Sequence, residues 1–276
     1  MTVTTTHAPA TSAAAGAPYT GASLPTQIAV LSQRSIKAYV SDKRQLITSL
    51  MMPVIMLLLF SQVFGSIANT AAFPPGVTYI NFLVPAIIVT TVMSAATSSG
   101  VGLVSDLESG VLNRFRALPI NLLAVPTARS LAGIVRSTFQ AIVIIALAFV
   151  FLGFRPAGGI PGLIAAIGVS VVLGFGLSWI FLALGATFRH AETVQTVSMV
   201  VMFPLMFASS AYVPVASLPT WLQVIAKVNP LTYAIDASRH FCLGQPSLNA
   251  TVLSLVISLA IAGIGMIWAA RAFRKL

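Results

Sequence analysis

The chain has 276 residues, of which 57% are apolar and only 7% are charged, and its mean hydropathy is +0.96. A soluble domain is typically about 45–50% apolar and about 25% charged. So few charged side chains cannot cover a globular surface, which excludes an ordinary soluble enzyme and indicates that most of the chain is solvated by lipid. At roughly 20 residues per membrane span, this length allows about six helices with loops and a tail.

The net charge of +10 would suggest nucleic-acid binding in a soluble protein. Here the basic residues lie between apolar runs, so their distribution carries the information. Cys242 is the single cysteine, which excludes an intrachain disulfide and a metal site built from several cysteines. With three histidines in the chain, we expect no metal site.

The N-terminal 44 residues divide into two parts. Residues 1–22 are mostly Ala, Thr, Ser, Gly and Pro, which predicts a disordered tail, and they lack the basic start and apolar centre of a signal peptide. Residues 23–44 are predicted to form an amphipathic helix that lies on the membrane surface, with a poorly ordered basic arm as the alternative. The apolar side of this helix carries Leu24, Ile28, Leu31, Ile36, Tyr39 and Val40.

Residues 45–276 are predicted to form one transmembrane domain of an all-α integral membrane protein. No charged residue occurs from Gln45 to Ser105, and the loop signals Asn69 and Pro74-Pro75 divide that stretch in two. The six predicted spans are about 45–65, 79–103, 131–153, 160–186, 194–211 and 249–270.

The basic residues predict the orientation of these spans. With the N-terminus in the cytoplasm, twelve of the 15 basic residues fall in cytoplasmic segments, and only Arg155, Lys227 and Arg239 fall outside. We therefore expect a multi-pass protein of the plasma membrane with both termini in the cytoplasm. The positive charge then indicates contact with anionic inner-leaflet lipid rather than with nucleic acid.

Several kinds of chemistry are missing from the sequence. It has no Gly-Lys phosphate loop, no H-E-x-x-H and no G-x-S-x-G, so nothing in it supports enzymatic activity and we expect none, with an intramembrane enzyme as the alternative. The five acidic residues lie in predicted loops or at span ends, which argues against a proton- or sodium-coupled carrier, although ion sites made of carbonyls stay possible. Asp236 precedes Arg239 by three residues, a spacing that suits an ion pair of structural role.

The loop between spans two and three has an amphipathic pattern. Pro119 discourages helix beyond Leu118, so the pattern predicts a short helix that offers Glu108, Arg114 and Arg116 to a partner. The alternative is a solvated loop whose arginines only fix the topology. The apolar positions that share a helical face are Val111, Leu112, Phe115 and Leu118.

The segment before the last span predicts two short helices, because Asn229 and Pro230 interrupt a helical pattern that begins near Trp221. Two short helices outside a span suggest a re-entrant hairpin in the outer leaflet. The alternative is an interfacial loop anchored by Trp221 and Tyr233.

Spans two and five are rich in methionine, phenylalanine and small polar residues. Flexible thioethers and aromatic faces suit varied apolar ligands, so these spans are candidates for a substrate path, with ordinary helix packing and lipid contact as the alternative. The candidate path residues are Asn81, Thr90, Met93, Met202, Phe203, Met206 and Phe207. The glycines expected to allow close helix approach are Gly174, Gly176, Gly263 and Gly265.

Two segments carry a resemblance to a known family. The run ESGVLNRFRALP at 108–119 resembles a motif of type-2 ABC exporter permeases, and it is most similar to that of the daunorubicin-resistance group. The run NPLTYAIDASR at 229–239 resembles the segment that precedes the last span in the same superfamily. Their order and spacing agree with the family over about residues 24–272.

The resemblance implies a division of labour between subunits. A separate cytoplasmic ATPase, in two copies, would bind ATP and Mg, while this chain binds no cofactor and pairs with an identical or related permease. Residues 23–44 would be the connecting helix, and the hairpin residues Trp221, Asn229, Pro230 and Tyr233 would close the exit side. Coupling to the ATPase is assigned by resemblance to Glu108, Gly110, Leu112, Arg114, Phe115, Arg116 and Pro119, with Arg189 and Glu192 as a second contact.

The sequence therefore predicts the permease subunit of an ABC exporter that moves an amphiphilic drug or lipid-like molecule, as in multidrug efflux and antibiotic resistance. The partners would be membrane lipid, the substrate, the ATPase and the second permease, and not nucleic acid. An ion-coupled secondary carrier or a channel that needs no ATPase is the first alternative. A membrane scaffold without transport is the second.

Overall fold

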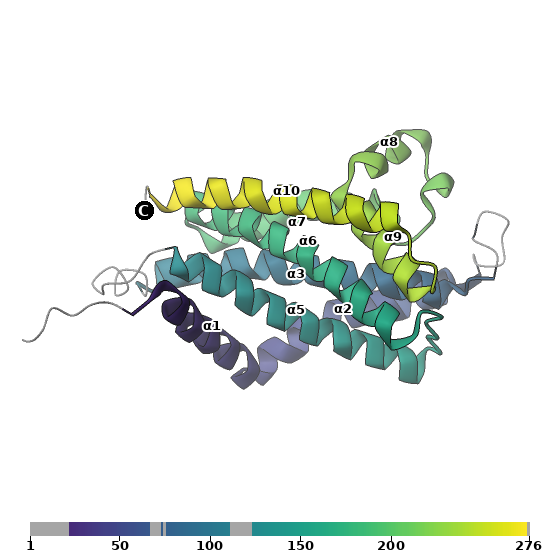
Figure 1. The fold of residues 1–276 in the computed structure, drawn as a ribbon, viewed down its shortest axis with the longest axis horizontal. Helices are drawn as coiled ribbons and strands as arrows, with labels where there is room; N and C mark the ends of the chain where they lie inside the picture. Colours follow the sequence, from purple (N-terminus) through teal and green to yellow (C-terminus); the bar gives the residue numbers. More distant parts are fainter. Residues whose placement is uncertain (1–21, 67–72, 74–75, 111–122, 275–276) are drawn as a thin grey trace, which may run out of the picture.

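The structure, a computed structural model, describes residues 22–66, 73, 76–110 and 123–274, and every regular element in these ranges is a helix (Figure 1). The all-α prediction is therefore confirmed for this part of the chain. Residues 1–21 of the predicted tail lie outside the described residues. The elements are α1 (Leu24–Ser41), α2 (Lys43–Val63), α3 (Tyr79–Glu108), α5 (Ala124–Phe151), α6 (Gly159–Phe188), α7 (Ala191–Phe207), the short 3₁₀ turn η2 (Val215–Ser217), α8 (Thr220–Val228), α9 (Pro230–Cys242) and α10 (Leu248–Phe273).

Two helices form the centre of the bundle. Most of α3 and α6 is buried, whereas α2, α5 and α10 lie around them and expose much of their apolar surface. Among the described residues, five helices are long and apolar enough to cross a membrane, namely α2, α3, α5, α6 and α10. Apolar α7 has 17 residues and is shorter than these five.

The break between the first two helices differs slightly from the prediction. α1 ends at Ser41, and Asp42 caps α2 by accepting a hydrogen bond from the backbone N–H of Gln45 at 3.1 Å. Lys43 and Arg44 therefore begin α2 instead of ending the amphipathic helix. α1 lies beside α5, with Tyr39 buried, whereas Val40 on the predicted apolar side is 60% exposed.

The ends of the long helices are shifted for physical reasons. α3 continues past residue 103, to Glu108, and α5 begins before residue 131, at Ala124. The added turns of these helices contain Asp106 and Arg129, whose ion pair stabilises the two helix ends against each other. α7 stops at Phe207, short of residue 211. The Nδ2 group of Asn229 donates to the carbonyls of Leu205 and Ala208, at 2.6 and 2.7 Å, and so replaces helical N–H donors at that end.

Glycines allow the backbones of α6 and α10 to approach each other closely. A Cβ atom on Gly176 would lie 2.6 Å from the carbonyl oxygen of Ser258, and one on Gly265 would lie 2.8 Å from the backbone nitrogen of Ile180. Gly174 similarly faces the Val92 side chain across the α3 interface. Gly263 has open space around it, so the expected packing role is wrong for that residue.

We predict that Gly265→Ala lowers the thermal stability of the purified chain, because its new methyl group must displace backbone of α6. Overpacking of this kind costs about 1–3 kcal/mol. Gly263→Ala is the matched control on the same helix. It should leave the melting temperature unchanged or slightly raised, because alanine is the better helix former and nothing obstructs its methyl group. Equal melting temperatures for the two variants would contradict this packing.

Candidate functional site

A cavity of about 360 Å³ lies between α2, α3 and α7. Five of the seven predicted path residues line it, and they come from two helices far apart in the sequence: Thr90 and Met93 from α3, and Met202, Phe203 and Met206 from α7. Most of the residues predicted for the substrate path therefore lie around one cavity. The other lining residues are Met52, Pro53, Met56, Ser94, Thr97, Ser98, Gln195, Ser198, Met199 and Tyr212.

The cavity wall is apolar and adaptable in character. Six of the chain's nine methionines line it, and no charged side chain is among the lining residues. Its hydroxyl groups are largely occupied by their own helices: Ser94 donates to the carbonyl of Thr90, and Ser198 donates to that of Val194. Thioethers repack around ligands of different shape, so this wall suits an apolar or amphiphilic molecule better than an ion.

Two predicted path residues lie elsewhere. Asn81 lines a different cavity, of about 830 Å³, and its Oδ1 accepts a hydrogen bond from the backbone N–H of Arg155 at 3.0 Å. Phe207 is not a lining residue, but its ring packs against Phe203, with centroids 4.8 Å apart, and against Tyr212 at 5.3 Å. Asn81 therefore positions the loop after α5, and Phe207 supports the cavity wall from behind.

The contribution of α2 was missed by the sequence analysis. Met52, Pro53 and Met56 line the cavity from this helix, yet the predicted path included only spans two and five. The signal was present, because the first span has the same combination of methionines and an internal proline as α7. Periodicity alone does not indicate which face of a uniformly apolar helix meets a neighbour.

The residues predicted as two separate contacts for a partner lie together at one end of the bundle. Glu108, at the end of α3, accepts a hydrogen bond through Oε1 from the backbone N–H of Ala191 at 3.3 Å. The turn from α6 to α7 is tight because Arg189 has a φ of 59°. Glu192 lies in the first turn of α7, where the helix dipole stabilises a carboxylate. Gly110 also has a positive φ, of 70°, which suits glycine.

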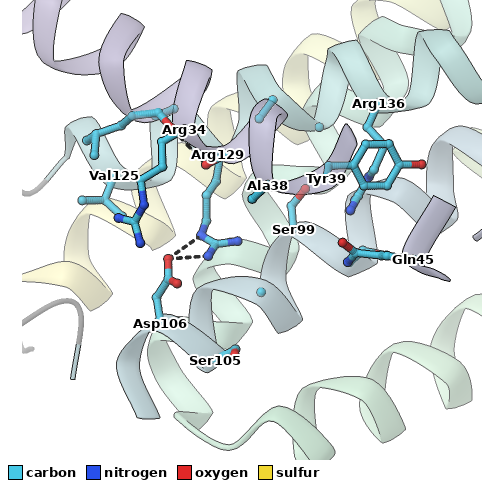
Figure 2. A pocket seen from close by; sticks show the side chains of 17 residues that line it. Arg34, Ala38, Tyr39, Gln45, Ser99, Ser105, Asp106, Val125, Arg129 and Arg136 are labelled. Carbon is cyan, nitrogen blue, oxygen red and sulfur yellow. Dashed lines mark hydrogen bonds and ion pairs between the residues drawn. The ribbon is translucent and has the colours of Figure 1, made fainter. Parts of the chain in front are cut away.

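The remaining predicted coupling residues lie outside the described residues. They are Leu112, Arg114, Phe115, Arg116 and Pro119. On either side of them, Asp106 and Arg129 connect α3 to α5 through an ion pair in which Nε and Oδ2 are 3.1 Å apart (Figure 2). The ends of α3, α5 and α7 that flank this loop are thus held to one another by side-chain contacts.

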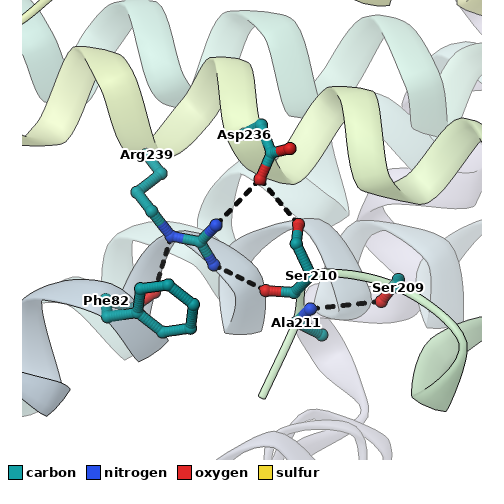
Figure 3. Close-up of polar contacts among 6 residues, drawn as sticks. All are labelled: Phe82, Ser209, Ser210, Ala211, Asp236 and Arg239. Carbon is teal, nitrogen blue, oxygen red and sulfur yellow. Dashed lines mark hydrogen bonds and ion pairs between the residues drawn. The ribbon is translucent and has the colours of Figure 1, made fainter. Parts of the chain in front are cut away.

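A second polar cluster lies at the opposite end of the bundle, where Arg239 of α9 is almost fully buried (Figure 3). Its Nη1 donates to Asp236 at 2.8 Å, Nη2 to the carbonyl of Ser210 at 2.7 Å and Nε to the carbonyl of Phe82 at 3.3 Å. A carboxylate and two backbone carbonyls thus surround the buried guanidinium of Arg239. The predicted Asp236–Arg239 ion pair is confirmed.

The predicted hairpin residues lie around the junction of α8 and α9. Asn229 separates the two helices and caps α9, since its Oδ1 accepts from the backbone N–H of Leu231 at 3.0 Å. Pro230 is the first residue of α9, and Tyr233 donates to the carbonyl of Lys227. Trp221 is 66% exposed on α8, so it does not contribute to the bundle's core.

Comparisons with known proteins identify relatives over most of the chain. The family described as ABC-2 type transporter matches residues 26–243. The daunorubicin resistance ABC transporter permease protein DrrB1 of Streptomyces coeruleorubidus is 34% identical over 84% of this chain and 80% of its own length. The probable doxorubicin resistance ABC transporter permease protein DrrC of Mycobacterium tuberculosis is 25% identical, over 83% of this chain and 82% of its own length. A putative transport permease, ycf38, of Porphyra purpurea is 30% identical over 78% of this chain and 73% of its own length.

We predict that Asn229→Ala destabilises the protein by about 2–4 kcal/mol, because it removes a helix cap and leaves two buried carbonyls of the α7 end unpaired. Asn229→Asp separates the two effects, since it keeps the capping oxygen and loses both donors. Thermal unfolding should place it between the wild type and Asn229→Ala. Wild-type stability in both variants would contradict the proposed role of Asn229.

Proposed function

Because this chain belongs to the ABC-2 type transporter family, we propose that it is the permease subunit of an exporter that moves amphiphilic drug or lipid-like molecules with energy from a separate ATPase. Membership confirms the resemblance noted in residues 108–119 and 229–239. The chain is a multi-pass membrane permease, and its relatives are transport subunits.

The uncharged methionine-rich cavity is the observation that carries this proposal. It lies among three apolar helices, and the exposed fractions of Met199 and Phe203 on its rim are 67% and 53%. A ligand can therefore reach the cavity from the side of the bundle that faces lipid or a second subunit. An amphiphile already dissolved in the membrane fits this access and this wall, and a small hydrophilic solute fits neither.

A second permease subunit is proposed to cover that same side. The rim helices α2 and α7 expose large apolar side chains, among them Met52, Leu59, Val200 and Val201. A pair of permeases meeting there would enclose the cavity at their interface. We propose a homodimer or a heterodimer with a related permease, with Asn81, Thr90, Met93, Met202, Phe203, Met206 and Phe207 near its substrate path.

The ATPase is proposed to dock at the end of the bundle where α3 and α7 meet. Glu108 and Ala191 hold the two loops together there, so a force applied to either loop reaches α3, which lines the cavity. ATP and Mg would be bound by the ATPase alone. The coupling residues are proposed to be Glu108, Gly110, Leu112, Arg114, Phe115, Arg116 and Pro119, with Arg189 and Glu192 beside them.

The proposed membrane arrangement follows from the distribution of basic residues along the chain. We propose six spans in the plasma membrane, with α7 as the short fifth span, both termini in the cytoplasm and α1 at the membrane surface. Helices α8 and α9 would form a re-entrant hairpin at the outer end, where Trp221, Asn229, Pro230 and Tyr233 close the exit. Twelve of the 15 basic residues lie in the segments proposed to be cytoplasmic, which supports this orientation.

We predict that Met93→Trp reduces export at least about tenfold, because the larger ring fills the cavity that the substrate occupies. Efflux should be measured in cells that also express the ATPase, with daunorubicin as the first probe because a relative's name includes it. Met266→Trp on α10 is the matched control, because Met266 lines none of the cavities described and is 36% exposed. Equal efflux from both variants at equal membrane levels would contradict a substrate path through this cavity.

We predict that exchanging Arg114 and Arg116 for glutamate lowers co-purification of the ATPase about tenfold or more, because the substitution reverses the charge of the proposed docking loop. The control exchanges Arg271 and Arg274 for glutamate, which makes the same change in charge at the end of α10. If both double variants retain the ATPase, the docking assignment is wrong. Loss of efflux in the Arg114 and Arg116 double variant, with the permease at normal levels in the membrane, would also argue against a scaffold without transport.

A further inference from the structure

A polar cavity of about 270 Å³ lies between α1, α3 and α5, apart from the methionine-rich cavity (Figure 2). Arginines line it from two helices: Arg34 from α1, and Arg129 and Arg136 from α5. Asp106 is the single carboxylate among the lining residues, so three guanidinium groups face one negative charge. The lining is therefore positively charged overall, in a chain with few charged residues.

The ion pair within the cavity uses the available carboxylate. Asp106 Oδ2 accepts from Nε of Arg129 at 3.1 Å and also contacts its Nη2. The lining side chains together carry three positive charges and one negative charge. A charge excess inside a partly enclosed, low-dielectric site favours an anion much more strongly than the same charges would on an open surface.

Arg136 is the residue that most clearly lacks a complete set of partners. It follows Arg129 by seven residues, which places it about 10 Å further along α5 and away from the helix end. Its Nη2 donates to the carbonyl of Ala95, and its guanidinium lies 5.4 Å from the centre of the Tyr39 ring. Its Nε is buried with no hydrogen-bond partner among the described residues. A buried charged donor without an acceptor is costly, and an anion beside the Arg136 guanidinium would offset part of that cost through its charge.

We propose that this cavity binds a phosphate group, and that the phosphate belongs to the headgroup of an anionic membrane lipid. Guanidinium groups bind phosphate through paired N–H donors, which makes arginine better suited to this anion than lysine. The volume suits a headgroup rather than a whole lipid. The apolar wall residues Leu31, Val125 and Ala132 provide a surface on which the glycerol and the upper acyl chain can lie.

The position of α1 favours a lipid as the source of the phosphate. The cavity separates α1 from α3, and α1 is attached to the bundle mainly along α5, where the Ser32 hydroxyl donates to the carbonyl of Ala128 at 3.3 Å. A headgroup between Arg34 and Arg136 would connect α1 to α5. The lipid would thus fix the amphipathic helix at the membrane surface, a role separate from transport. Ser98 is the one residue that lines both this cavity and the methionine-rich one.

The test measures thermal unfolding of the full chain in uncharged detergent during titration with three probes: short-chain phosphatidylglycerol, short-chain phosphatidylcholine and inorganic phosphate. Phosphatidylglycerol should stabilise the wild type most, and Arg34→Gln or Arg136→Gln should each weaken its apparent affinity about tenfold. Lys37→Gln is the matched control, because it removes one positive charge from α1 at a position that does not line the cavity. Its affinity should stay within about twofold of the wild type.

The probes distinguish the source of the phosphate. Stabilisation by inorganic phosphate that depends on the same two arginines would support the phosphate site and replace the lipid by a soluble anion. If Arg136→Gln does not fold, Arg136→Lys and Arg34→Gln still test the site, with lysine expected to retain part of the affinity. The proposal is overturned if Lys37→Gln weakens phosphatidylglycerol binding as much as Arg34→Gln does, or if no probe distinguishes the wild type from the arginine variants.

Discussion

The separation of charge from the centre of the bundle is the constraint on which the rest of this structure depends. A charged side chain at the depth of the hydrocarbon costs free energy unless it has partners. Among the described residues, Arg129 has Asp106, and Arg239 has Asp236 together with two backbone carbonyls. The contacts of Arg129 and Arg239 fix the mutual positions of the helices that they join, and Arg136, further along α5, donates to a backbone carbonyl of α3.

This constraint gives the three levels of the bundle different chemistry. At one end, Asp106 and Glu108 join α3 to α5 and to the start of α7. At the other end, Arg239 connects α9 to α3 and to the turn after α7. Between them lies the methionine-rich cavity, and two of its three helices, α3 and α7, are held by these contacts. Such an arrangement suits a device in which a movement at one end changes the shape of an uncharged space in the middle.

The sequence predicted the helical class and the approximate positions of the long helices, because apolar runs and prolines locate helices in a chain of this composition. Five of the seven residues predicted for the substrate path line the methionine-rich cavity. It did not predict the role of α2 or the free space at Gly263, because a uniformly apolar helix gives no periodic signal for its packed face. The extended ends of α3 and α5 depend on the pairing of Asp106 with Arg129, which are distant in sequence. Such contacts follow from tertiary packing and not from local pattern.

Transport by purified chain in liposomes, with and without its ATPase partner, tests the central claim most directly. The measured quantity is the movement of an amphiphilic fluorescent probe under three conditions: chain alone with an ion gradient, chain with ATPase, and chain with ATPase and ATP. We predict movement only in the third condition, and its loss in Met93→Trp. Movement by the chain alone under an ion gradient, without nucleotide, would contradict the account and indicate a secondary carrier or channel.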